Sequence, residues 1–147
     1  MQSIGRFKVK KRLGTGSQGS VWLGVDPEVD RPVAVKLLEQ PLAGGGARRR
    51  FLAAVQVIRQ IRHPGIVSVF EAGEQDGRPY LVFEYVQGEL LSDWLSRPKI
   101  DLQQGLDLLT SLLSALNEAH QKGVVHGDLK PANIRVSPEG IPRVMDF

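Results

Sequence analysis

The chain opens with short runs in which apolar and polar positions alternate, a pattern typical of β-strands with one buried face. Runs rich in β-branched residues are separated by glycine- and serine-containing turns, and a further turn is expected at Asp76-Gly77. Five strands are predicted in this way, at residues 6–13, 21–25, 31–38, 66–71 and 80–85.

Helical spacing replaces this alternation in two main places. Residues 48–62 follow a glycine run at 44–46, which we expect to be flexible, and the helix should end before Pro64. The stronger pattern spans residues 102–121, with Asp101 as N-cap, Gln104 completing a capping box and Gly123 just beyond the end. Its apolar stripe has spacings of three and four residues and consists of Leu102, Leu106, Leu109, Leu113 and Leu116.

The remaining pattern gives the fold class. A short helix is predicted at 91–95, and residues 124–147 are expected to form a strand, a loop, and two strands joined by a turn at 138–140. The order indicates an α+β protein, with a β-sheet and one helix first and a helical region with a short hairpin second.

Composition excludes several classes of protein. Hydrophobic residues are 41% and charged residues 24% of the chain, which argues against disorder. No apolar run approaches the length of a membrane span, and the first residues lack the apolar core of a secretory signal. The chain has no cysteine, so a disulfide framework is excluded and a cytoplasmic location is expected.

Charge is distributed unevenly along the chain. Residues 1–70 have twelve Lys or Arg and four Asp or Glu, whereas residues 71–147 have seven and twelve. This asymmetry suits an anionic ligand held between a basic and an acidic half, although an uneven solvated surface explains it equally well. The three arginines at 48–50 begin the predicted helix and are assigned to a solvated face, so no nucleic-acid partner is expected.

Three groups of residues indicate a particular chemistry. The first is the glycine-rich turn GTGSQGSV, with Gly14, Thr15, Gly16 and Gly19, where backbone N–H groups can approach phosphate oxygens. A strand rather than a helix is expected after these glycines, which argues against a dinucleotide-binding fold. When this segment is considered without the rest of the chain, a β-hairpin that binds no ligand explains its glycines.

The second group is a single residue, Lys36, in the run VAVK of a predicted strand. An unpaired buried ammonium is costly, so the position implies a nearby anion. An edge strand with Lys36 facing water is the alternative.

The third group is the loop HGDLKPAN with the final Met-Asp-Phe. Asp128, Lys130 and Asn133 follow the strongest helix, and a hairpin should return Asp146 to the same place. Two carboxylates, an amide and an ammonium together suit Mg²⁺ and a phosphoryl group.

The order of these motifs resembles that of the eukaryotic-type (Hanks-type) protein Ser/Thr kinases, including the bacterial members, over nearly the whole chain. The resemblance implies a protein-kinase-like α+β fold, with a five-stranded antiparallel sheet and one helix in the small lobe. Residues 1–86 would form that lobe and the hinge, and residues 87–147 the start of the larger lobe, ending at the Asp-Phe of the family's Asp-Phe-Gly motif. The chain is therefore expected to be a truncated portion of the kinase domain that transfers little phosphate by itself.

The resemblance also implies a role for each motif residue, with ATP and Mg²⁺ as cofactors and a protein Ser/Thr hydroxyl as acceptor. Asp128 would be the catalytic base, Lys130 would neutralise developing charge, and Asn133 and Asp146 would hold the metal. Lys36 would contact the α- and β-phosphates. The remaining residues would surround the nucleotide: Gly14, Thr15, Gly16 and Gly19 over the phosphates, Val21, Ala34, Phe83 and Arg135 around the base, and Glu84 to Val86 at the hinge.

The sequence departs from the family's pattern at three positions. Ala54 stands where the family has a helix glutamate that pairs with the strand lysine, and no Asp or Glu occurs between residues 40 and 70. Arg135 replaces a leucine below the adenine, where it could stack on the base, narrow the pocket or turn outward. Gly127 replaces the arginine before the catalytic aspartate, so activity should not depend on a phosphorylated activation loop.

These departures keep two alternatives to the protein kinase open. One is a pseudokinase or nucleotide-binding interaction module, and the other is a small-molecule phosphotransferase of kinase-like fold. The leucine stripe, if it is exposed, is expected to promote self-association.

Overall fold

The computed structural model describes residues 2–147, which divide into two compact units. The first unit contains the chain up to Arg59 together with Ser68–Tyr85, and the second contains Gln60–Val67 with Val86–Phe147. The chain therefore contributes the short segment Gln60–Val67 to the second unit before it returns to complete the first.

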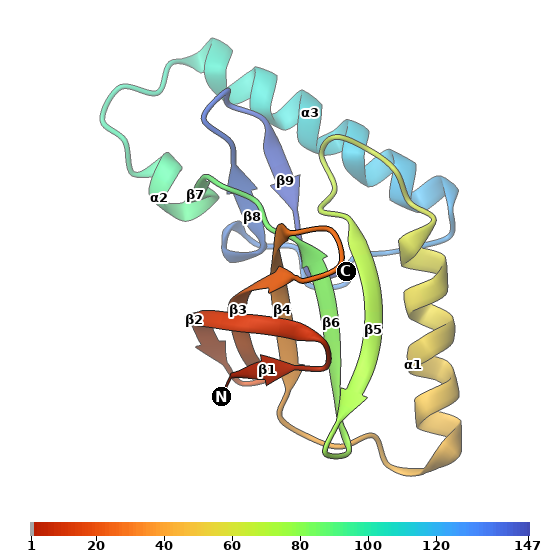
Figure 1. Cartoon of the computed structure of the whole chain (residues 1–147). Helices are drawn as coiled ribbons and strands as arrows, with labels where there is room; N and C mark the ends of the chain where they lie inside the picture. The colour runs from red at the N-terminus through yellow and green to blue at the C-terminus, as the bar shows by residue number, and fades with distance from the viewer. Residues whose placement is uncertain (1) are drawn as a thin grey trace. The chain divides into compact units, whose positions relative to one another are not determined.

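The first unit is built on an antiparallel sheet with the strand order β1-β2-β3-β4-β6-β5 (Figure 1). The five predicted strands are all present, and the two-residue β1 is an additional strand at the β2 edge. The turn at Asp76-Gly77 is confirmed, since both residues have positive φ angles, 52° and 76°. The strands are β1 (Ser3–Ile4), β2 (Phe7–Gly16), β3 (Gly19–Asp26), β4 (Arg31–Leu38), β5 (Val69–Gln75) and β6 (Arg78–Glu84).

Alternation along the central strands decides which side chains form the core of this unit. On β4, Val33, Val35 and Leu37 are buried, whereas the residues between them are half-buried. Successive side chains of a strand point to opposite faces, so the valines and the leucine all lie on one face. There they join a cluster completed by Ile4, Phe7, Tyr80 and Val82.

The helix of the first unit, α1 (Gly44–Arg59), packs beside β5 (Figure 1). The predicted start of the helix near residue 48 was wrong, because the glycines at 44–46 form its first turn. The helix ends at Arg59, three residues earlier than predicted. Val55 is its buried residue, and Arg48 forms an ion pair with Glu74 of β5 at 2.8 Å.

The second unit combines helices with a small antiparallel sheet of order β7-β8-β9. The short helix at 91–95 and the turn at 138–140 are confirmed, but residues 124–126 form no strand. A mostly aliphatic cluster fills this unit, with Trp94, Leu108, Ala115 and Val144 among its buried members. The elements are β7 (Glu89–Leu90), α2 (Leu91–Leu95), α3 (Leu102–Gln121), a 3₁₀ turn η1 (Pro131–Asn133), β8 (Ile134–Val136) and β9 (Pro142–Val144).

The long helix α3 has the predicted bounds and the predicted caps. The Asp101 carboxylate accepts from the backbone N–H of Gln104, the Gln104 side chain accepts from the N–H of Asp101, and Gly123 follows the helix with a φ of 78°. The face that packs into the unit is not the leucine stripe, however. It consists of Leu108, Leu112, Ala115 and Ala119.

The stripe itself is largely exposed. Leu102, Leu106, Leu109 and Leu113 are between 48% and 79% exposed. The small Ala115 and Ala119 let α3 lie close to the rest of the unit on its packing face. The leucines of the stripe lie on the other side of the helix. Across residues 2–147, no helix has both the length and the apolar character that a membrane span requires.

Candidate active site

The glycine-rich segment forms the predicted hairpin between β2 and β3. Gly14 pairs with Val21, and Gly16 pairs with Gly19. A Cβ atom at Gly14 or Gly16 would meet nothing within 4 Å, whereas one at Gly19 (φ +151°) would collide with the carbonyl oxygen of Leu37. Gly19 therefore permits the close approach of two strands, while the other two glycines leave open space above the backbone.

The strand register brings the predicted pocket residues of the first unit onto one face of the sheet. Val21 lies directly opposite Lys36, and Ala34 lies directly opposite Phe83. Opposite residues in an antiparallel pair point to the same side, and so do residues two apart on one strand. Val21, Ala34, Lys36 and Phe83 consequently share the face opposite the aliphatic core.

Lys36 has a neighbour that the sequence did not suggest. Its Nζ donates to Oε1 of Gln18, in the hairpin turn, at 3.4 Å. The exposed Ala54 contributes no carboxylate, and α1 contains no acidic residue at all. The turn of the glycine-rich hairpin and the strand lysine are thus linked by a neutral amide.

The expected hinge residues lie where the first unit ends and the second begins. The N–H of Glu84 donates to the carbonyl of Ser68 at 2.9 Å, and a Glu84 carboxylate oxygen accepts from the N–H of Ser68 at 3.3 Å. These bonds hold the end of β6 against the start of β5. Val86 belongs to the second unit and is buried there.

In the second unit, Asn133 connects the predicted catalytic loop to the end of the chain. Its Nδ2 donates to the carbonyl of Asp128 at 2.8 Å, and its own carbonyl accepts from the N–H of Met145 at 2.8 Å. The antiparallel pairing of β8 with β9 brings these segments together, with Ile134 opposite Val144. The predicted return of the chain to the loop is confirmed.

His126 forms hydrogen bonds to the same two segments, the loop and the end of the chain. Its Nε2 donates to the carbonyl of Met145 at 2.6 Å, and its Nδ1 accepts from the N–H of Asp128 at 3.2 Å. The two bonds together require a neutral ring with its proton on Nε2. The ring also packs against Phe147 at a centroid distance of 4.8 Å, so His126 acts as a structural residue.

The charged side chains of the loop face solvent. Lys130 Nζ lies 3.2 Å from a carboxylate oxygen of Asp128, and both side chains are more than half exposed. Asp146 is exposed as well and has a φ of 61°, an uncommon conformation for a residue with a side chain. An ammonium, two carboxylates and an amide are thus gathered on one loop and one strand end.

Two of the departures from the family have structural consequences. Gly127 has a φ of 83°, which a side chain there would strain, so this glycine serves the backbone of the loop. The Arg135 guanidinium donates to the carbonyl of Gly88 at 3.0 Å. Arg135 therefore ties β8 to the start of β7.

Asn133 and Asp146 have oxygen atoms of the kind that bind a divalent cation shared with a phosphorylated ligand. Asn133 is only 8% exposed, and its Nδ2 is committed to Asp128, which leaves Oδ1 as the amide atom for a metal. Within residues 2–147 no cluster of three acidic, histidine or cysteine side chains could hold a metal by itself. Mg²⁺ commonly takes one or two carboxylates and completes its shell with phosphates and water.

Comparisons with known proteins agree with this arrangement. A family model described as the protein kinase domain matches residues 7–147. The chain belongs to the protein kinase family. Relatives named serine/threonine-protein kinases include PknA of Mycobacterium tuberculosis, 39% identical over 97% of this chain, and PksC of Streptomyces coelicolor, 37% identical over 97%.

Solved structures give the same family and the same fold. The PknI kinase domain of Mycobacterium tuberculosis matches 99% of this chain with 29% identity and a TM-score of 0.84. The chain spans 60% of that solved kinase domain, 35% of PknA and 28% of PksC. The protein-kinase-like fold expected from the sequence is confirmed.

Proposed function

We propose that this chain is the nucleotide-binding part of an ATP- and Mg²⁺-dependent protein serine/threonine kinase. The observation that carries the proposal is the joint presence of Lys36 on the face of the sheet opposite the aliphatic core and of Asp128, Asn133 and Asp146 on one loop and the strand end beside it. Family membership supports the reaction, since relatives across 97% of the chain are named serine/threonine-protein kinases.

Each unit contributes its own share of the chemistry in this proposal. In the first unit, N–H groups of the hairpin around Gly14 and Gly16 and the ammonium of Lys36 bind phosphate oxygens. Val21, Ala34 and Phe83 supply an apolar surface for the base, and backbone groups of Glu84 and Val86 bind its edge. Thr15 and Gly19 complete the hairpin over the phosphates.

In the second unit, Asp128 accepts the proton of a Ser or Thr hydroxyl, and Lys130 neutralises charge on the transferred group. Asn133 Oδ1 and the Asp146 carboxylate hold Mg²⁺, which, when bound, offsets the charge of the phosphates. Arg135, through its bond to Gly88, fixes the segment that follows the hinge rather than stacking on the base. The residues 1–147 span 60% of a solved kinase domain, so by themselves they should bind nucleotide and transfer little phosphate.

Thermal unfolding with ATP, with and without MgCl₂, tests the proposal. A ligand at about a hundred times its dissociation constant stabilises the folded state by roughly 2.7 kcal/mol, which raises Tm measurably. Lys36→Gln should weaken ATP binding about tenfold with or without Mg²⁺, because it removes a charge-assisted contact. Asp146→Asn should remove only the additional stabilisation that Mg²⁺ provides.

Lys8→Gln is the matched control, since Lys8 is exposed on β2 in the same unit. If ATP does not change Tm, the chain does not bind nucleotide and the proposal fails. Equal shifts for Lys36→Gln and Lys8→Gln would remove Lys36 from the site.

A pseudokinase is the second candidate, and the absence of a carboxylate from α1 favours it. In that case ATP would stabilise the chain to the same extent with and without Mg²⁺. Ala54→Glu, made in a longer version of the protein that phosphorylates a peptide, should raise the rate if lysine placement limits a true kinase. An unchanged rate would mean that Lys36 is placed well enough without a helix glutamate.

A further inference from the structure

The turn of the glycine-rich hairpin is fixed to β4 through its backbone. The carbonyl of Gln18 accepts from the N–H of Glu39, just beyond the end of β4, at 3.0 Å. The next residue, Gly19, pairs with Leu38, and a Cβ atom on this glycine would collide with the backbone of β4. Gln18 is therefore held close to the strand that contains Lys36, although its own side chain is exposed.

The side chain of Gln18 reaches Lys36 from this fixed position. Its Oε1 accepts from the Lys36 Nζ at 3.4 Å, which is slightly longer than the usual N–H···O distance. Both residues belong to the first unit, and Lys36 is half-buried on the sheet face that we assign to the nucleotide. An ammonium has three N–H donors, so Lys36 can keep Gln18 as a partner while it binds phosphate oxygens.

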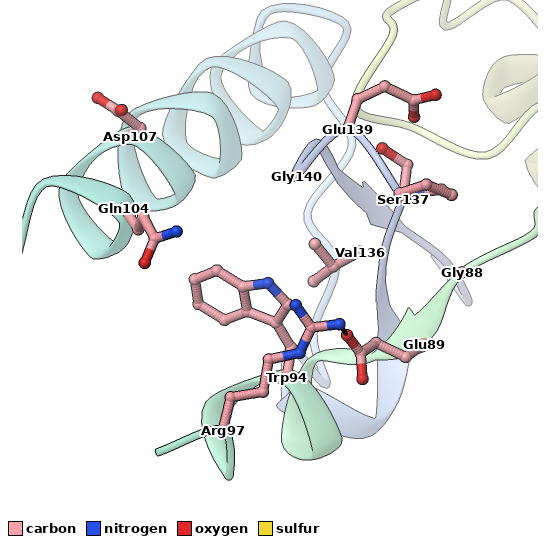
Figure 2. A pocket seen from close by; sticks show the side chains of 11 residues that line it. Gly88, Glu89, Trp94, Arg97, Gln104, Asp107, Val136, Ser137, Glu139 and Gly140 are labelled. Carbon is pink, nitrogen blue, oxygen red and sulfur yellow. Dashed lines mark ion pairs between the residues drawn. The ribbon is translucent and has the colours of Figure 1, made fainter. Parts of the chain in front are cut away.

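Gln18 is a neutral partner, and this property matters for the charge of the site. Elsewhere in the protein, carboxylates hold cations. Arg48 pairs with Glu74. Arg97 pairs with Glu89, as Figure 2 shows beside a pocket of the second unit. A carboxylate offsets the positive charge that it orients, whereas an amide oxygen orients an ammonium and leaves its charge in place for an anionic ligand.

We propose that Gln18 is a positioning residue for Lys36. The side-chain oxygen of Gln18 directs the ammonium toward the phosphates of a bound nucleotide, a task that the family gives to a helix carboxylate. The helix α1 has no acidic residue, and Ala54 occupies the position expected for that carboxylate. The inference rests on the proposed function, because it assigns a role within the same nucleotide site.

Gln18 also joins the two phosphate-binding parts of the first unit. Its backbone bond connects the hairpin turn to the end of β4, and its side-chain bond connects the turn to Lys36. The N–H groups around Gly16 and the ammonium therefore share one framework before a ligand arrives, which lowers the cost of ordering them on binding. Loss of the Gln18 side chain should weaken ligands that have phosphates and leave a nucleoside unaffected.

A double-mutant cycle tests this role. Gln18→Met keeps the length of the side chain and removes its acceptor, and Lys36→Met removes the donor. Calorimetry measures the affinity of the chain for ATP with MgCl₂ and for adenosine. Gln18→Met should weaken ATP binding about threefold to tenfold, because the ammonium loses one hydrogen bond that orients it, and should leave the affinity for adenosine unchanged.

The second half of the cycle separates positioning from direct contact with the phosphates. In the Lys36→Met background, Gln18→Met should change the ATP affinity by less than about twofold, since Gln18 has no ammonium left to orient. The matched control is Gln56→Met, at an exposed glutamine of α1, which should bind ATP as the unchanged chain does. Circular dichroism and Tm without ligand verify that each variant keeps the fold.

The contact itself can be measured without nucleotide. In amide NMR spectra, the side-chain NH₂ group of Gln18 is identified by its absence from Gln18→Met. Its resonances should move in Lys36→Met, because the Lys36 ammonium touches the same side chain. They should stay in place in Lys8→Met, which removes an exposed ammonium from β2.

The role of Gln18 is overturned by an unchanged ATP affinity of Gln18→Met, by an equal loss with and without Lys36, or by an equal loss for ATP and adenosine. Gln18 resonances that do not move in Lys36→Met overturn it as well. If the unchanged chain binds no ATP, the proposed function fails and the positioning role fails with it. If ATP binds and only Lys36→Met weakens it, the proposed function stands and the role of Gln18 is wrong.

Discussion

The side-chain amide of Asn133 donates to the backbone carbonyl of Asp128 at 2.8 Å. The bond spans the loop on which both residues lie, and Asn133 is nearly buried. One asparagine thereby fixes the loop through its nitrogen and leaves its oxygen for a ligand.

Replacing Asn133 with Ala should lower the free energy of unfolding by about 0.5–1.5 kcal/mol, since the Asp128 carbonyl loses the hydrogen bond that the Asn133 amide donates. Urea denaturation measures the change. Asn117→Ala, at an exposed position of α3, should have nearly the stability of the unchanged chain. Equal stability of the two variants would show that the loop does not need the Asn133 bond.

The φ angle of Gly127 predicts the effect of restoring the family's arginine. Gly127→Arg should destabilise the chain by about 1–2 kcal/mol, because a left-handed backbone is strained for a residue with a Cβ atom. The matched variant Gly105→Ala lies inside α3, where a Cβ meets nothing within 4 Å, and it should stabilise by about 0.5–1 kcal/mol. If both variants shift Tm in the same direction, backbone conformation does not decide how an added side chain changes stability at these two positions.

Asp26 gives the first unit a pH-dependent stability. Burial by itself would raise the pKa of this carboxyl, but the N–H of Glu28 and the guanidinium of Arg6 hold the pKa below its usual value of 3.8. The carboxylate therefore stabilises the folded state above the pKa of the unfolded chain, and this contribution is lost as pH falls through the lower folded-state pKa.

Asp26→Asn should consequently be less stable than the unchanged chain at neutral pH, and the difference should shrink in acid, below about pH 4. Chemical denaturation across this pH range measures the difference. Glu28→Gln, at an exposed neighbour, should show a smaller dependence on pH. A difference that is constant from neutral pH into acid would mean that the Asp26 carboxylate is not linked to folding.

The exposed leucines of α3 should drive self-association of the residues 1–147. The double variant Leu106→Lys, Leu113→Lys should shift the chain toward monomer in sedimentation velocity, because it breaks the apolar stripe with charge. The variant Asn117→Lys, Gln121→Lys adds the same charge to the same helix and retains the leucines. Equal sedimentation of both double variants would assign the effect to net charge rather than to the stripe.

Local chemistry made much of the fold readable from the sequence. The capping box at Asp101 and the bounds of α3 depend on neighbouring residues, as does the turn at Asp76-Gly77. The return of the chain from Asn133 to Met145 followed from a short hairpin, which reverses the chain over a few residues. These features are fixed by contacts that lie close together along the chain.

Other features were decided by contacts between distant segments. Helical spacing identified the leucine stripe of α3 as an apolar face. Only the neighbouring elements decide that Leu108, Ala115 and Ala119 pack within the unit and that the stripe is largely exposed. The Gln18–Lys36 contact and the Arg135–Gly88 bond join residues whose proximity no local pattern encodes. The sequence alone thus determined which chemical groups the protein has and most of its secondary structure. The tertiary structure decided which of these groups meet, because burial and strand register depend on the whole of each unit.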